Sequence, residues 1–226
     1  MIVREGLPFI VFGIVVTAAL ILSAARWDSW VAFVLSLVVA LLTVFTAFFF
    51  RNPVRQVPTE TNILVAPADG TVVAIDSLEN HPFIGGKAVR VSIFLSIFDV
   101  HLNRTPAAGV IDYVKYNPGQ FLAAYEDKAS EVNEQTEIGM TDGAGHKLVF
   151  KQIAGIIARR IVCRLKAEQP VALGERFGMI RFGSRTDLIY PTAYETRVTK
   201  GQHVTAGETV MASLVAAAGQ QEGETP

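Results

Sequence analysis

Two uncharged apolar segments near the N-terminus constrain the fold more than any other feature of this sequence. Leu7 to Ala25 and Trp30 to Phe50 contain no charged residue, and only four residues separate them. At about 1.5 Å per residue, the second segment reaches roughly 30 Å, which is the thickness of the hydrocarbon core of a bilayer. The first segment, with 19 residues, is just long enough as well. The sequence therefore predicts a transmembrane helical hairpin with a tight turn.

The charges that flank the two segments predict the orientation of the hairpin. Arg4 precedes the first segment, Arg51 and Arg55 follow the second, and the turn holds only Arg26 and Asp28. Because Lys and Arg favour the cytoplasmic side, both ends of the hairpin are expected in the cytoplasm. Two alternatives stay open. One is a cleaved secretory signal peptide, against which the second segment argues. The other is a hairpin that lies in the plane of the membrane.

The overall charge and the cysteine content exclude further classes of protein. The formal net charge is −1, so no basic surplus exists to bind nucleic acid. The one cysteine, Cys163, cannot form an internal disulfide. Its apolar setting in Ile161–Cys163 is typical of a buried, inert thiol in a reducing compartment.

The composition changes after Arg51, where Pro53 and Pro58 interrupt any helix. From there on, short apolar runs alternate with turn pairs such as Asp69-Gly70, which is typical of strands and hairpins. We therefore expect a membrane hairpin over residues 1–55 and a mainly β, barrel-sandwich-like domain over residues 56–226.

Two segments of the expected β domain are local exceptions. Phe121 to Val132 has the composition of a short helix. Ala218 to Pro226 is polar and rich in glycine, which predicts a disordered tail. The domain is thus expected to contain one or few short helices among its strands.

Two segments of the expected β domain resemble each other and the tight turns of barrel-sandwich domains. They are Pro67 to Val72 and Lys200 to Glu208, and both contain the glycines that such turns need for positive φ. Lipoyl and biotinyl carriers and secretion adaptors share this pattern. A membrane-tethered adaptor without enzyme activity is therefore a rival interpretation, although no lysine here has the methionine neighbours of a carrier site.

A series of short motifs occurs in one order along the chain, and each is weak alone. A Gly-Ser dipeptide such as Gly183-Ser184 is most often only a turn, and Asp-Gly is a common turn pair. The motifs are Phe49-Phe50-Arg51-Asn52-Pro53, Pro67-Ala68-Asp69-Gly70, Asp99-Val100-His101 with Pro106, Pro118-Gly119-Gln120-Phe121, Asn133-Glu134, and Gly178 with Phe182-Gly183-Ser184.

Together these motifs resemble those of the phosphatidylserine decarboxylases, and the short chain with paired spans resembles their short bacterial form. The resemblance implies a proenzyme that cuts itself between Gly183 and Ser184 into a large chain, 1–183, and a small chain, 184–226. Ser184 would become a pyruvoyl group, which forms a Schiff base with the substrate amine. The implied reaction of this carboxy-lyase is conversion of phosphatidylserine to phosphatidylethanolamine and CO2 in phospholipid biosynthesis, without a metal. A related serine lipid is an alternative substrate.

The resemblance also implies residues that support the serine. A hydroxyl is a weak nucleophile at neutral pH, and it needs a base that a carboxylate usually orients. Asp69 matches the family's acidic residue, and His101 matches the first histidine of an Asp-x-His-x-x-His pattern. Arg104 stands where longer members have the second histidine, so either His101 serves both cleavage and decarboxylation, or Asp69 and backbone strain suffice for cleavage. The planar guanidinium of Arg104 suits a lipid phosphate or a carboxylate.

The expected partners and location follow from the same resemblance. They are phosphatidylserine in the bilayer, the complementary chain of the processed heterodimer and, at a further level, other copies in a higher oligomer. The catalytic domain is expected on the cytoplasmic face of the cell membrane, where the hairpin raises the effective concentration of substrate headgroups.

Overall fold

The computed structural model describes residues 1–120, 132–155, 161–180 and 184–215. The expected short helix, apart from Val132, the expected tail and Gly183 lie outside the described residues. The chain divides into two compact units. One comprises Met1–Val54 and Ile97–His101, and the other comprises Arg55–Ser96 with the chain from Leu102 onward.

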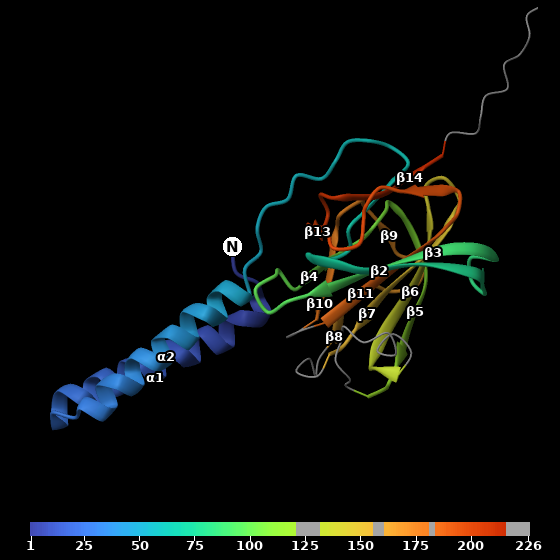
Figure 1. Cartoon of the computed structure of the whole chain (residues 1–226). Coiled ribbons are helices and arrows are strands. Elements are labelled where there is room, and N and C mark those ends of the chain that lie inside the picture. Colours follow the sequence, from blue (N-terminus) through green and yellow to red (C-terminus); the bar gives the residue numbers. More distant parts are fainter. Residues whose placement is uncertain (121–131, 156–160, 181–183, 216–226) are drawn as a thin grey trace, which may run out of the picture. The chain divides into compact units, whose positions relative to one another are not determined.

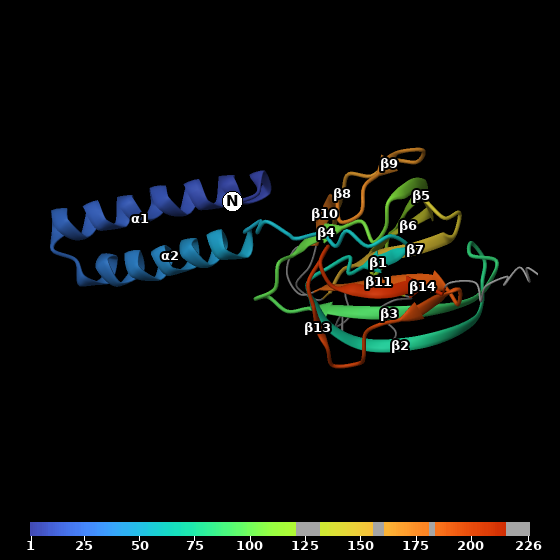
Figure 2. The same cartoon turned by 90° about the horizontal axis from the view of Figure 1, so that it is seen from above.

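The first unit is built on two antiparallel helices, which confirms the two predicted apolar helices (Figures 1 and 2). They are α1, Leu7–Trp27, and α2, Trp30–Phe49, and a short 3-10 turn, η1, Arg4–Gly6, precedes them. Both helices are long and apolar enough to cross a membrane.

The turn and the helix contact have local causes. Asp28 ends α1 in the left-handed conformation (φ 48°), and the Ser29 side chain caps α2 by accepting a hydrogen bond from the amide of Ala32. Gly13 lies against Thr43, and a Cβ at Gly13 would stand only 2.2 Å from the Thr43 hydroxyl oxygen. A small residue at position 13 therefore lets the two helices approach closely.

The second unit is mainly β, as predicted, and contains fourteen strands among the described residues. An eight-stranded antiparallel sheet has the order β13-β2-β3-β11-β7-β6-β5-β9, and two three-stranded sheets have the orders β1-β14-β12 and β4-β10-β8. Figure 1 shows the large sheet curling through β2, β3, β11, β7, β6 and β5. The strands are β1 Ile63–Val65, β2 Gly70–His81, β3 Gly86–Leu95, β4 Leu102–Arg104, β5 Gly109–Asn117, β6 Gln135–Asp142, β7 Lys147–Ile153, β8 Ile161–Cys163, β9 Pro170–Val171, β10 Arg176–Ile180, β11 Ser184–Pro191, β12 Tyr194–Thr196, β13 His203–Val204 and β14 Val210–Leu214.

The two glycine-containing turn segments that resemble each other in sequence pair with each other in the fold. β13 runs antiparallel to the start of β2, with His203 opposite Thr71 and Val204 opposite Gly70. Gly70 has φ 151°, and a Cβ there would stand 2.2 Å from the carbonyl oxygen of Phe94. Only glycine allows this close approach of the Pro67–Val72 segment to β3.

The main core lies between the large sheet and the smaller ones. It is formed by fully buried side chains such as Ile93, Ile138, Phe150 and Leu188. On β11, Leu188 points into this core, whereas Ile189 points to a small cluster with Val149 on the opposite face. This alternation places Ser184 and Thr186 on the core side of β11, because side chains two residues apart share a face.

Candidate active site

Ser184 is the first residue of β11, the strand between β3 and β7 in the large sheet (Figure 2). It pairs with Leu95 of β3, and its side chain is completely buried. The hydroxyl oxygen has no hydrogen-bond partner among the described residues. Leaving a buried hydroxyl unpaired costs about 1–3 kcal/mol, so such an atom requires a reason. An oxygen held this way is available as a nucleophile.

A buried polar network lies next to Ser184 on the same face of β11. Asn103 of β4 donates through its amide nitrogen to the hydroxyl of Thr186 (3.4 Å) and contacts the carbonyl oxygen of Pro67 (3.5 Å). Gln152 of β7, which pairs with Thr186, donates to the side-chain oxygen of Asn103 at 2.8 Å. Asn103, Thr186 and Gln152 are fully buried. The network thus ties the turn that bears Asp69 to the strand that begins with Ser184.

The opposite face of β11 carries a second buried polar group. The guanidinium of Arg185 pairs with the carboxylate of Asp187 at 2.7 Å and donates to the hydroxyl of Ser92 at 2.5 Å. Arg185 and Asp187 are each about 1% exposed. Removing one partner of such a pair costs several kcal/mol, because it leaves a buried charge without compensation. The strand start is therefore fixed by polar contacts on both faces.

Asp69 lies beside Ser184 but not against it. Thr71 of β2 and Arg185 of β11 both pair with Phe94 of β3, so Asp69 and Ser184 flank the same end of β3. Two strand spacings separate them, about 10 Å. The structure thus brings Asp69 and Ser184 to the same end of the strands in the large sheet.

The carboxylate of Asp69 is engaged by other groups. Arg55 donates to its two oxygens at 2.9 and 2.6 Å, and the backbone amide of Ala206 donates to Oδ1 at 2.8 Å. Asp69 is therefore fixed in orientation, and its oxygens are acceptors for donors from Arg55 and from the Lys200–Glu208 turn. From the sequence alone, Arg55 served only to predict the orientation of the hairpin, and its contact with Asp69 was not predicted.

His101 belongs to the compact unit that contains the hairpin, whereas Asp69 and Ser184 belong to the β domain. The His101 ring is buried and lies 4.4 Å from the ring of Phe49. Its Nδ1 is 3.0 Å from the carbonyl oxygen of Asp99. A carbonyl can only accept, so Nδ1 carries the proton and Nε2 is left as an acceptor. Nε2 has no partner among the described residues.

The pKa of His101 differs from that of a solvent-exposed histidine. Burial lowers the pKa of His101 to about 4, although the Asp99 carbonyl and carboxylate act in the opposite direction. His101 is therefore neutral at physiological pH. A neutral imidazole with a free Nε2 has the protonation state that a proton acceptor needs.

Arg104 has structural contacts, and the environment of Cys163 disfavours a reactive thiol. Arg104 donates to the carbonyl oxygen of Gly174 at 2.9 Å, and its aliphatic stem lies against Gly207. Burial lowers the pKa of Arg104, with Arg55 nearby acting in the same direction. Desolvation raises the pKa of the Cys163 thiol, which disfavours the reactive thiolate. Among the described residues, no three His, Cys, Asp or Glu side chains gather as metal ligands would.

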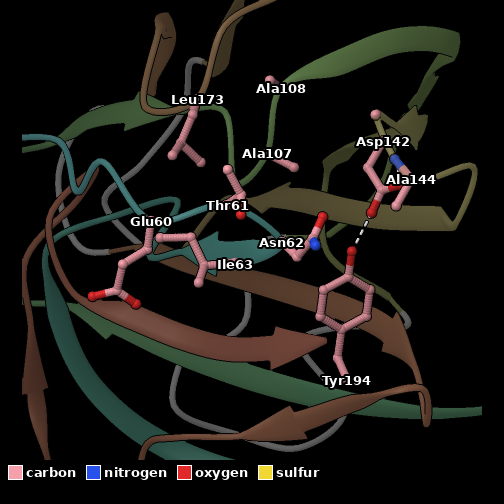
Figure 3. Close-up of a pocket in the computed structure, with 11 residues that line it drawn as sticks. Glu60, Thr61, Asn62, Ile63, Ala107, Ala108, Asp142, Ala144, Leu173 and Tyr194 are labelled. Atoms are coloured by element: carbon pink, nitrogen blue, oxygen red, sulfur yellow. Dashed lines mark hydrogen bonds between the residues drawn. The ribbon is translucent and has the colours of Figure 1, made fainter. Parts of the chain in front are cut away.

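A separate cavity of about 230 Å³ lies at the other end of the large sheet (Figure 3). Asp142 and Tyr194 line one side of it, and the Tyr194 hydroxyl donates to the Asp142 carboxylate. Asp142 is the last residue of β6, whereas Gln135 at its start is aligned through Ile153 with Arg185. Seven residues of strand, roughly 23 Å, thus separate this cavity from the Ser184 end.

The sequence model of the phosphatidylserine decarboxylase family matches residues 42–212. Proteins named phosphatidylserine decarboxylase proenzyme are similar over nearly the whole chain. The one from Desulfotalea psychrophila is 42% identical over 212 residues, which cover 94% of this chain and 96% of the relative. Those from Symbiobacterium thermophilum and Burkholderia mallei are 43% and 42% identical, each over 94% of this chain and 95% of the relative.

These matches, with the mainly β domain and the buried serine at the start of a central strand, define a carboxy-lyase that acts on a phospholipid. The chain belongs to the phosphatidylserine decarboxylase family. This membership sets aside the rival interpretation of a non-enzymatic adaptor.

Proposed function

We propose that this chain cuts itself between Gly183 and Ser184 and then converts phosphatidylserine to phosphatidylethanolamine and CO2. The observation that carries the proposal is the Ser184 hydroxyl, which is completely buried and has no partner among the described residues. A structural serine at a strand start would satisfy its hydroxyl. The name proenzyme on the relatives gives independent support.

The cleavage chemistry requires only the chain itself and one water molecule. The Ser184 oxygen attacks the carbonyl carbon of Gly183, the peptide C–N bond breaks, and an ester replaces the amide. Loss of the Ser184 α-proton then expels the Gly183 carboxylate and leaves a dehydroalanine. Water hydrolyses its imine tautomer, ammonia leaves, and position 184 keeps a pyruvoyl group.

The two chains would remain associated after the cut. The small chain contributes β11, β13 and β14, and these strands pair with β3 and β7, with β2, and with β1 of the large chain. Each partner therefore completes a sheet of the other. The product is a heterodimer made from one precursor.

The roles proposed for His101 and Asp69 follow from the family resemblance and from the groups around each of them. His101 would accept the serine proton at Nε2, and Asp69 would position the turn beside the strand start. The site fits a group derived from Ser184, because the buried side chain has no hydrogen bond to any described residue that would have to be broken. That ketone would supply the electron sink for loss of CO2 from the substrate.

The location of the lipid substrate gives the helices and Arg104 their proposed roles. Arg4, Arg51 and Arg55 flank the same end of the hairpin, which favours the cytoplasmic face for the β domain. Arg104 would bind the lipid phosphate or the substrate carboxylate in addition to the Gly174 carbonyl. Arg104→Gln should then raise KM for the lipid and leave self-cleavage intact, and an unchanged KM would remove Arg104 from the site.

Denaturing electrophoresis and intact mass of the purified full chain test the proposal. We expect two chains, and the small one should lack a free amino group and be lighter by one ammonia than the unmodified 184–226 peptide. Ser184→Ala should remain a single inactive chain. A wild-type protein that stays uncut yet decarboxylates, or a free amino group on Ser184, would overturn the mechanism.

The same preparation distinguishes the lipid substrates. Purified enzyme assayed with phosphatidylserine and with a serine ether lipid should release CO2 faster from phosphatidylserine. The opposite order would keep the cleavage chemistry and replace the substrate.

A further inference from the structure

A five-residue loop from the middle of the chain belongs to the same compact unit as the hairpin. Ile97–His101, which follows β3, is grouped with Met1–Val54 rather than with the β domain. The side chain of Phe98 is 63% exposed and that of Ile97 is 38% exposed. Two adjacent exposed apolar side chains at a loop tip are unusual in a protein surface that faces only water.

Two contacts attach Phe98 of this loop to the end of α2. The Phe98 ring meets the Phe45 ring edge-on, with 6.5 Å between centroids. Arg51 donates to the Phe98 carbonyl oxygen at 2.7 Å, and its guanidinium lies 3.8 Å above the Phe48 ring. Phe45 is four residues, about 6 Å, from the end of α2. The Phe98 side chain therefore lies at the level of the last turns of an apolar helix.

The composition around this helix end is that of a membrane interface. Phe9 stacks on Phe50 with 6.0 Å between centroids, and Phe48 is 43% exposed. Arg4 and Arg51 stand at the same end of the helix pair. Aromatic rings and arginines gather where a spanning helix leaves the hydrocarbon core.

We propose that Ile97 and Phe98 insert into the phospholipid bilayer beside the end of α2, so that the bilayer itself fixes the segment that carries His101. The occupant is the bilayer because the loop is continuous, through Phe45 and Phe48, with the apolar surface of a membrane-spanning helix. His101 is three residues from Phe98, at most about 10 Å along the chain, which places it in the headgroup layer. The relevance of this insertion to catalysis rests on the proposed function.

Tryptophan fluorescence tests the docking without any need for activity. The chain has two tryptophans, Trp27 and Trp30, and both are replaced by Phe in a full-length Ser184→Ala background. Phe98→Trp is then introduced, and the protein is reconstituted in phosphatidylcholine vesicles with or without brominated acyl chains. We expect strong quenching by the brominated lipid and a blue-shifted emission. Ile97→Trp gives a second reporter if Phe98→Trp does not fold.

Val110→Trp is the matched control. Val110 is similarly exposed, at 45%, and its register through Thr141 and Lys147 places it at the end of the sheet remote from Leu95. Its emission should be indifferent to bromination. Equal quenching at positions 98 and 110, or none at 97 and 98, would overturn the proposal.

A second experiment connects docking to turnover. Phe98→Asp should lower kcat/KM for phosphatidylserine in vesicles roughly tenfold, because the insertion of one apolar side chain is lost. The loss with monomeric short-chain phosphatidylserine should be at least severalfold smaller. Equal losses with both substrates would indicate a packing role and reject docking. Self-cleavage, read on a gel, reports separately on the proposed function.

Discussion

The carboxylate of Asp69 and the guanidinium of Arg55 form an ion pair in which the shortest N–O distance is 2.6 Å and both side chains are about 10% exposed. Arg55 is the first residue of the β domain after the hairpin unit. The residue that follows the hairpin unit therefore holds the acidic residue that the resemblance implicates in cleavage. Loss of the Arg55 contacts should thus lower the stability of the uncut chain and affect its self-cleavage.

Arg55→Ala should destabilise the uncut chain by about 3 kcal/mol, because it leaves a largely buried carboxylate without its partner. For a chain of this size, that loss lowers Tm by roughly 6–12 °C. Thermal unfolding of the full-length Ser184→Ala protein in detergent measures it. Arg55→Lys keeps the charge and should lose less than half as much. An Arg55→Ala variant with unchanged Tm would show that the pair contributes nothing.

The Asn103 network should govern how fast Ser184 reacts. Asn103→Ala removes contacts to Thr186, Gln152 and Pro67, and we expect the half-time of self-cleavage to lengthen roughly tenfold, equivalent to about 1.4 kcal/mol. Thr186→Val, which loses only the hydroxyl, should have a smaller effect. Thr186→Ser should restore the wild-type rate. Time courses of precursor conversion give these values.

Val149→Ala separates positioning from simple destabilisation. Val149 is fully buried on the opposite face of β7, in the cluster with Ile189. It should lower Tm by at least as much as Thr186→Val and leave the cleavage rate close to wild type. If Val149→Ala slows cleavage as much as Asn103→Ala does, the network acts only through stability.

The lowered pKa of His101 predicts an unusual pH dependence. Because His101 stays neutral down to about pH 4, the cleavage rate should remain near its plateau from pH 7.5 to about 5. An unperturbed histidine would instead cause the rate to fall below about pH 6.5. Precursor conversion followed across this range distinguishes the two cases.

The same group should make the stability depend on pH. The unfolded chain binds the His101 proton more tightly than the folded one, so the contribution is fully present above about pH 6.5 and is lost as pH falls toward 4. It amounts to something on the order of 3 kcal/mol. In the Ser184→Ala background, adding His101→Asn should flatten Tm against pH over this window. A slope that persists would place its origin elsewhere.

Tyr194→Phe should affect stability alone. It removes the hydroxyl that donates to the buried Asp142 carboxylate, and a lost hydrogen bond to a charged group costs about 1.5–3 kcal/mol. Burial next to Asp142 raises the pKa of Tyr194, so the hydroxyl keeps its proton and the effect should be constant from neutral pH to about pH 9. Unfolding and precursor conversion are measured together. Slowed conversion would connect the cavity in Figure 3 to the reaction.

The features that the sequence predicted are those with local causes. Uncharged apolar length predicted α1 and α2. Short apolar runs between turn pairs predicted a mainly β domain. The motif order predicted the family. These signals extend over a few residues each, so the amino-acid order alone carries them.

The contacts that build the site are not local. Asn103 reaches Thr186 across 83 positions and Gln152 across 49, and only the strand register brings them together. Register depends on which strands pair, and a single sequence does not state the pairing. One signal was present: Thr186 lies two residues after Ser184 and so shares its face. The attachment of Phe98 to α2 likewise depends on packing between distant segments.

The interleaving of β11, β13 and β14 with strands from earlier in the chain has a consequence for assembly. While the backbone is continuous, these strands find their neighbours as one molecule, at a rate independent of concentration. After the proposed cleavage of the bond between residues 183 and 184, refolding would require two separate chains to associate, and its rate would fall with dilution. The cleaved enzyme would thus keep its fold because its two chains unfold and dissociate slowly. Only the intact precursor could refold readily.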